Sequence, residues 1–149
     1  MIHQNIELTE FQSLGNFSKN IDKDLLSRAL VNCEISILQK WMGLKAVAEF
    51  DDYSDNIKQL IYRALAILAS GWVMKNNVYV SRGGAVEKRD AEVSRNLNSA
   101  ELNTQVSQLR LEARELMLQA ERMAVDEESR TSYEWRREVN VLNLWSQSF

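Results

Sequence analysis

The residue types that most often carry out chemistry in proteins are scarce in this chain. Among its 149 residues there is one histidine, His3, and one cysteine, Cys33. We expect His3 to lie in a mobile N-terminal segment, which leaves no histidine-based triad, no HExxH motif and no Cys/His zinc cluster. Cys33 shares the apolar face of a predicted helix, so we expect it to behave as a small buried hydrophobic residue. A lone cysteine cannot form an intramolecular disulfide, which fits a reducing compartment.

The charged residues also fail to form a recognisable site. On the last predicted helix, acidic and basic residues are interspersed, and we expect a solvated face of mixed sign made of Glu112, Glu115, Glu121, Arg110, Arg114 and Arg122. Arg82-Gly83-Gly84 lacks the surroundings of a phosphate-binding loop. The formal net charge of -3 gives no positive field for DNA or RNA. We therefore expect no enzyme, no cofactor, no metal and no sequence-specific nucleic acid.

The composition predicts a soluble, mainly α protein. The chain has no proline and five glycines, where average usage predicts about seven and about ten. Its first residues lack the pattern of a signal peptide, and its most apolar run, 64–74, is far shorter than the roughly 20 residues that span a bilayer. We expect no contact with a membrane.

Three long helices account for most of the apolar pattern. The spacing predicts helices over 22–42, 57–76 and 99–127, the first ended by Gly43 and the second apolar nearly all round and therefore central. A short helix precedes them, with Thr9 as its N-cap and Gly15 as a left-handed stop. We expect an ordered loop over 44–56 and a small β-hairpin near 78–88, turning at Gly83-Gly84.

The last helix has apolar residues at alternating steps of four and three, as in a coiled-coil seam. The positions that define this predicted seam are Leu102, Val106, Leu109, Leu116 and Met123, with Ala113 and Ala120 between them. The seam is either the core-facing side of a bundle helix or a contact with a second copy. A helix of about 28 residues is about 40 Å long, so we expect part of it to protrude or to pack on another chain.

The residues after 128 form a second unit, an extended C-terminal arm over 129–149 that follows a helical domain over 1–128. Its apolar positions alternate and then run to the end of the sequence, which is typical of an extended segment that binds another surface. The candidate partner-binding residues are Tyr133, Trp135, Val139, Val141, Leu142, Leu144, Trp145 and Phe149. The arm docks either on its own domain or on another chain.

The order of these elements resembles the head-to-tail connector proteins of tailed bacteriophages. The resemblance covers about residues 8–125 and is carried by Leu8-Thr9-Glu10-Phe11, Asn20-Ile21-Asp22, Trp41-Met42-Gly43, the apolar helix 60–74, Gly83-Gly84-Ala85-Val86 and the long helix from Ser99. It implies a mainly helical structural protein of the virion, found in the host cytoplasm during assembly. It also implies a ring of identical subunits, commonly a dodecamer, that contacts the portal and other neck or tail proteins. The alternative from another class is a cytoplasmic helical adaptor or chaperone-like module that dimerises through the predicted seam.

Overall fold

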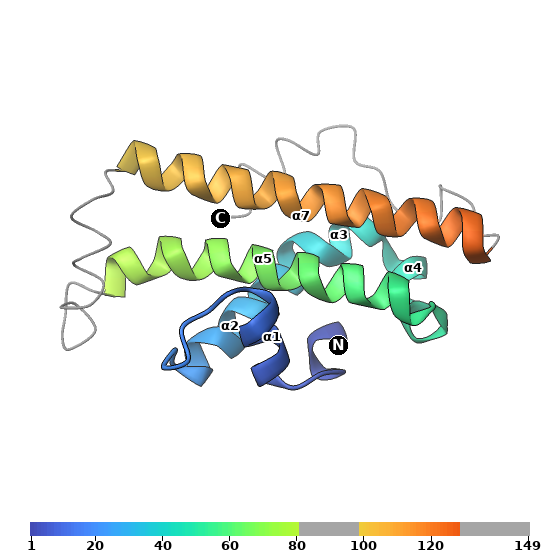
Figure 1. The fold of residues 1–149 in the computed structure, drawn as a ribbon, viewed down its shortest axis with the longest axis horizontal. Coiled ribbons are helices and arrows are strands. Elements are labelled where there is room, and N and C mark those ends of the chain that lie inside the picture. The colour runs from blue at the N-terminus through green and yellow to red at the C-terminus, as the bar shows by residue number, and fades with distance from the viewer. Residues whose placement is uncertain (81–98, 129–149) are drawn as a thin grey trace.

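The computed structural model describes residues 1–80 and 99–128, and within these ranges the protein is mainly helical. Two long helices, α5 (Asp55–Val80) and α7 (Ser99–Glu128), run antiparallel and side by side (Figure 1). The shorter helices α1 (Leu8–Leu14) and α2 (Lys23–Cys33) lie on the other side of α5. The predicted mainly α fold with a long final helix is therefore confirmed.

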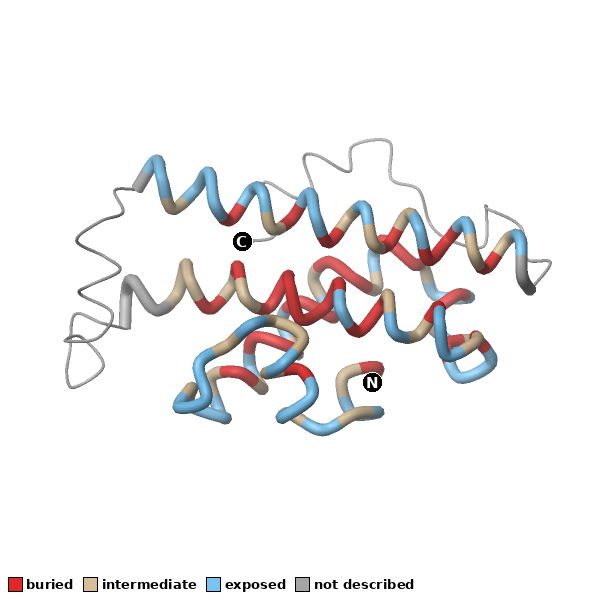
Figure 2. The backbone as a smooth tube through the Cα atoms, viewed as in Figure 1, coloured by how far each residue is buried: buried red, intermediate tan, exposed pale blue. Residues whose placement is uncertain are grey.

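Helix α5 is central because apolar residues lie on both of its sides. Six consecutive side chains, from Ala64 to Ala69, are buried, and a helix with a single apolar face could not bury such a run (Figure 2). One side packs on α7, where Ala113, Ala120 and Ala124 are fully buried and let the two backbones approach closely. The other side packs on α1 and α2.

The first predicted long helix is confirmed between Lys23 and Met42, but its middle is distorted. It begins at an Asp22 cap, where the Asp24 backbone N–H donates to Asp22 Oδ1 at 2.9 Å. After α2 the chain makes a π-helical turn, η2 (Glu34–Leu38), and then continues as α3 (Gln39–Met42). Gly43 ends it with a φ of 84°, a left-handed conformation that favours glycine, as predicted.

The details predicted for the short first helix are wrong. Helix α1 begins one residue before Thr9, with Glu7 at the cap position, and the residue of positive φ is Asn16 rather than Gly15. Gly15 is needed for close packing instead, since a Cβ there would lie 2.3 Å from a ring carbon of Phe17 and 3.0 Å from the Ala66 carbonyl oxygen. Asparagine tolerates the left-handed region, so it can end the turn while glycine provides the space.

The loop predicted over 44–56 is also wrong, because most of it is helical. It contains α4 (Leu44–Ala48) and a 3₁₀ turn, η3 (Phe50–Asp52). Ala46, Phe50 and Tyr53 are buried and attach the segment to the core. The ring of Phe50 packs edge to face against the ring of Tyr53 and against the ring of Tyr62 in α5. Tertiary contacts thus fold a stretch whose mixed composition suggested a loop.

The β-hairpin and the arm fall largely outside the described residues. Helix α5 extends to Val80, so it includes the positions at which we expected the first hairpin strand. The turn and the second strand, 81–88, and the arm, 129–149, are not among the described residues. Both stay predictions.

Helix α7 follows α5 along most of its length, and only its first turns stand clear of the core. From Ala100 to Gln105 the side chains are exposed, apart from the half-buried Leu102 (Figure 2). In the described ranges, no helix combines the length and the hydropathy needed to cross a bilayer.

We expect Leu65→Asp to unfold the protein or to lower its free energy of unfolding by about 4 kcal/mol or more. The side chain of Leu65 is fully buried in α5, and the substitution would place an unpaired charge there. Urea unfolding followed by circular dichroism measures the effect. Gln59→Asp, on the exposed face of the same helix, is the matched control. Equal stability of the two variants would show that α5 is not the centre of the core.

Candidate functional site

A buried carboxylate, Glu34, is the most unusual polar group of the described core. Its side chain is fully buried at the start of the π-helical turn. Its Oε1 accepts hydrogen bonds from the His3 backbone N–H at 2.7 Å and lies 2.9 Å from His3 Nδ1. Its Oε2 accepts from the Ile2 backbone N–H at 3.1 Å and from Gln39 Nε2 at 3.2 Å. Both oxygens are therefore satisfied from within the chain, as a buried charge requires.

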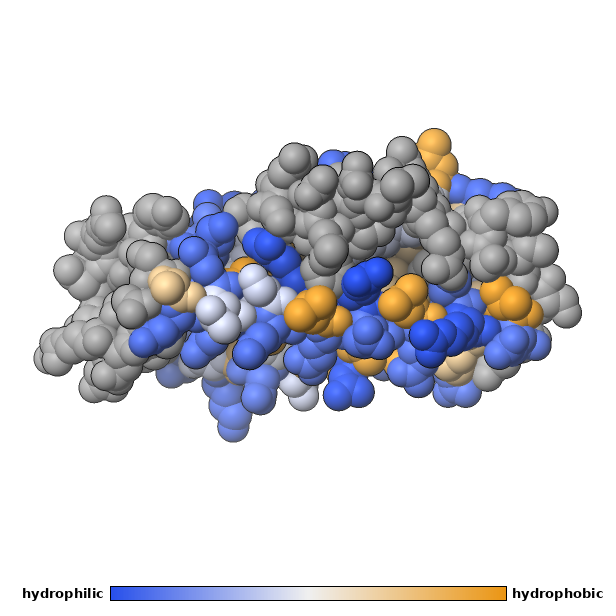
Figure 3. Space-filling model, turned by 90° about the horizontal axis from the view of Figure 1, so that it is seen from above, coloured by the Kyte–Doolittle hydropathy of each residue, from blue (hydrophilic) through white to orange (hydrophobic). Residues whose placement is uncertain are grey.

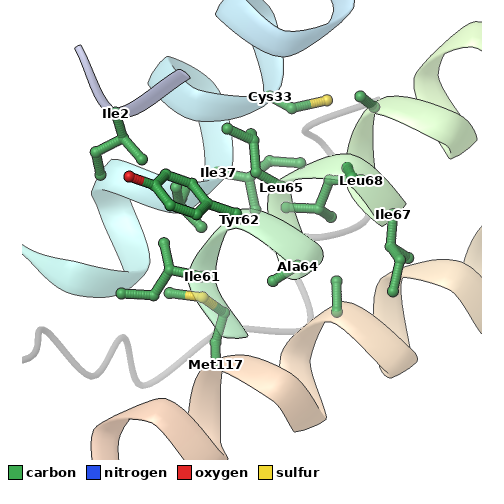
Figure 4. Packing of buried hydrophobic residues seen from close by; sticks show 14 of the residues in the cluster. Ile2, Cys33, Ile37, Ile61, Tyr62, Ala64, Leu65, Ile67, Leu68 and Met117 are labelled. Carbon is green, nitrogen blue, oxygen red and sulfur yellow. The ribbon is translucent and has the colours of Figure 1, made fainter. Parts of the chain in front are cut away.

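These contacts bind the N-terminal segment to the body of the protein. The segment folds as a 3₁₀ turn, η1 (Ile2–Gln4), which places two consecutive N–H groups toward the carboxylate of Glu34. Ile2 fills the core beside them (Figure 4). Our expectation that His3 lies in a mobile terminus is wrong, because a charged acceptor 31 residues away along the chain binds its backbone and its ring.

Tyr62 of α5 holds the same segment from a second side. Its ring lies beside Ile2 in Figure 4 and packs edge-on against Phe11 of α1 at a centroid distance of 6.0 Å. Burial raises the pKa of the Tyr62 hydroxyl, opposed by a hydrogen bond with the Asn5 side chain. The polar groups of this region therefore act in folding, by joining the N-terminus to α2 and α5.

Cys33 is buried, as the sequence predicts. Burial raises the pKa of its thiol strongly, and the nearby Arg110 charge opposes this only in part. Because the thiolate is the reactive form, Cys33 is a packing residue. Arg110 is itself buried on α7, where burial lowers the pKa of its guanidinium.

The prediction of a solvated face of acidic and basic residues on α7 is only partly correct. Glu112, Glu115 and Arg122 are exposed, as expected, and Arg114 is half-buried. Arg110 and Glu121 are buried instead, because they lie on the side of the helix that packs on the rest of the chain. Which charged residues are buried depends on how α7 is rotated about its own axis. The alternation of charges along the sequence does not reveal that rotation.

The buried stripe of α7 shares Val106, Ala113 and Ala120 with the predicted seam, but between these positions the buried residue is the one that follows the predicted residue. Val106, Arg110, Ala113, Met117, Ala120 and Ala124 are buried in steps of four and three, and Glu121 is buried beside them. Of the predicted seam residues, Val106 is buried, Leu109, Leu116 and Met123 are half-buried against the core, and Leu102 is half-buried near the start of the helix. In Figure 4, Met117 points toward Ile61 of α5. The seam residues Leu109, Leu116 and Met123 therefore pack against the core of their own chain. A contact with a second copy through the seam stays a prediction.

A second row of apolar residues on α7 was not predicted. Leu111 is 49% exposed, and Leu118 and Val125, seven and fourteen residues later, are half-buried. Among the described residues, none of the three belongs to the core cluster or to the half-buried residues packed against it. Seen from above α7, separate apolar residues lie along the molecule among hydrophilic ones (Figure 3). We call Leu111, Leu118 and Val125 the outer stripe.

A small open pocket lies where the end of α1 meets α5 and α7. Its volume is about 270 Å³, and its lining includes Asn16, Arg63, Ile67, Leu109 and Glu112. The charged side chains Arg63 and Glu112 are exposed, so the pocket offers no buried polar group to orient a ligand. Across residues 1–80 and 99–128, no group of histidine, cysteine, aspartate and glutamate side chains could hold a metal ion.

Sequence reasoning missed two features that the structure reveals. Glu34 interrupts the apolar face of its helix, one residue after Cys33 and three before Ile37, and a charge at such a position signals a buried partner. The residues of the outer stripe are seven positions apart in the sequence, but the longer seam pattern on the same helix was interpreted instead. The predicted partner-binding residues of the arm, from Tyr133 to Phe149, lie outside the described ranges.

Comparison of the chain with protein-family models, curated proteins and solved structures finds no match.

We expect Glu34→Gln to lower the free energy of unfolding by about 2 kcal/mol. The amide keeps the shape of the side chain but removes the charge and turns one acceptor into a donor that faces other donors. Urea unfolding measures the loss, and hydrogen exchange at the amides of Ile2 and His3 should become faster. Glu115→Gln, an exposed change of the same chemistry on α7, should do neither. Unchanged exchange at Ile2 and His3 would contradict the anchoring role of Glu34.

Proposed function

We propose that this protein is a structural component of a tailed-bacteriophage virion, a head-to-tail connector that forms a ring in the neck and joins the portal to the tail. The observation that carries the proposal is the outer stripe of α7, where Leu111 is exposed and Leu118 and Val125 are half-buried outside the described core cluster. An exposed apolar row on a rigid helix suits a protein–protein contact. The described polar cluster around Glu34 acts instead in holding the chain together.

The helical architecture supports the same proposal. Three of the segments that carry the resemblance to connectors are helical in the described ranges, in the order in which the resemblance needs them. They are the helix that opens after Asp22, the apolar helix α5 and the long helix α7. The resemblance therefore rests on a succession of elements as well as on short sequence matches.

A ring imposes a definite kind of contact between subunits. Identical subunits close into a ring through heterologous contacts, in which one surface meets a different surface of the next copy. We propose that the arm supplies one of these surfaces through its aromatic residues, and that the ring contacts the portal and other neck or tail proteins. The virion, and the host cytoplasm during assembly, are its proposed locations, and neither a membrane nor a specific nucleic acid sequence is a partner.

The alternative is a helical adaptor that dimerises through the predicted seam. One observation favours it: Leu109, Leu116 and Met123 are half-buried and thus still partly accessible. Another opposes it, because Val106 already packs within its own chain, as do Ala113 and Ala120. A symmetric contact between two copies of α7 through all of these positions would require α7 to lose its packing on α5.

Native mass spectrometry of the full chain, alone and with the portal encoded by the same phage genome, tests the proposal. We expect several copies to join each portal ring, while the isolated chain can stay monomeric. A stable dimer that ignores the portal would favour the adaptor. A single copy per portal, or no association at all, would contradict the connector.

We expect removal of residues 130–149 to abolish assembly and to leave the helical domain folded. Trp145→Ala alone should weaken association by about 2 kcal/mol, since buried aromatic residues usually dominate the energy of an interface. Thermal unfolding and assembly are measured on the same samples, with Ser146→Ala as the control. If the arm packs on its own domain, the truncation instead lowers the melting temperature strongly, and this result would refute a role in trans.

A further inference from the structure

We infer that the outer stripe of α7 is the surface on which the arm, residues 129–149, of a neighbouring copy binds. This inference rests on the proposed ring and names the receiving surface that the ring requires.

The stripe forms one continuous line on the helix. Positions seven residues apart differ by only about 20° around an α-helix, so Leu111, Leu118 and Val125 lie nearly one above the other. At about 1.5 Å per residue they extend over about 21 Å. The buried residues Ala113 and Ala120 face another direction, toward the core. A partner can therefore bind the stripe while α7 keeps its contacts with α5.

The arm has the length and the composition to cover this line. It contains 21 residues, starting directly after Glu128, and a fully extended chain of that length reaches about 70 Å. The stripe is less than a third of that, which leaves residues to bridge two subunits. The two tryptophans of the arm, Trp135 and Trp145, are large apolar side chains. Such side chains can fill the gaps between partly exposed leucines.

The charges of the two surfaces are complementary. Around the stripe, Glu112, Glu115 and Asp126 are exposed acidic residues, against two basic residues, the exposed Arg122 and the half-buried Arg114. The arm carries three basic residues, Arg130, Arg136 and Arg137, against two acidic ones, Glu134 and Glu138. An acidic helix face and a basic segment attract each other, which favours this pairing over contact between two copies of the same stripe.

The geometry of a ring selects the neighbour as the source of the arm. A closed ring needs two different surfaces on each subunit, and the arm and the stripe provide such a pair. Each subunit would then give its arm to one neighbour and receive the arm of the other. An arm that bound its own stripe would occupy both surfaces and leave neither for assembly.

Substitution in the stripe tests the inference on the full chain. We expect Leu118→Glu to weaken assembly on the portal at least tenfold, with little change in thermal unfolding, because the side chain is only half-buried and lies outside the described core cluster. Gln119→Glu adds the same charge at the next residue, on an exposed position, and should assemble like the unmodified chain. Equal assembly of Leu118→Glu and the unmodified protein would overturn the inference while the proposed ring stands. Failure of the unmodified chain to join the portal would instead contradict the proposed function.

Cross-linking separates a neighbouring copy from the same chain. Full-length Leu118→Cys and Ser146→Cys variants, mixed with the portal under mild oxidation, should give a disulfide-linked dimer that joins one chain of each kind. Gln119→Cys in place of Leu118→Cys should give much less. A doubly substituted chain that closes only an internal disulfide would overturn the inference in favour of binding in cis.

Discussion

The structure depends on the need of α5 to be covered on most sides. Six consecutive buried side chains, from Ala64 to Ala69, cannot be shielded by a single neighbour, so α7 must pack on one side and the N-terminal helices on the other. This requirement sets the order of the layers. It also explains the alanines of the α5–α7 contact, because two long helices that share so much surface need small residues where their backbones approach.

The N-terminal segment is joined to this core by charge as well as by apolar contact. Glu34 is buried with both carboxylate oxygens bonded, and two of its donors are backbone N–H groups of η1. A buried carboxylate without such partners would cost several kcal/mol, so the anchor specifies one position for the segment. The π-helical turn begins at this residue, and the side chain of Gln39, the first residue of α3, also binds the carboxylate. Helix distortion, buried charge and N-terminal turn thus form one unit.

The two faces of α7 divide folding from the assembly that we propose. Its buried stripe, with Ala113 and Ala120, packs on α5, whereas the outer stripe contains the exposed Leu111 and the half-buried Leu118 and lies among charged residues. A helix with two such rows can form a new contact without losing an old one. This separation suits a subunit that must be folded before it meets its neighbours, since assembly then requires no exposure of the core.

The sequence by itself determined the helical class, the central position of α5 and the burial of Cys33, because hydrophobic periodicity and the lack of proline are properties of local sequence. It also located Asp22 and Gly43 at the ends of a helix, where capping chemistry is local as well. Only the tertiary structure decided the rotation of α7, since two rows of apolar residues compete for the core and the shape of α5 selects between them. The same holds for α4, for the close packing of Gly15 and for the anchor at Glu34. Each of these depends on a contact between residues far apart in the chain, which no periodicity records.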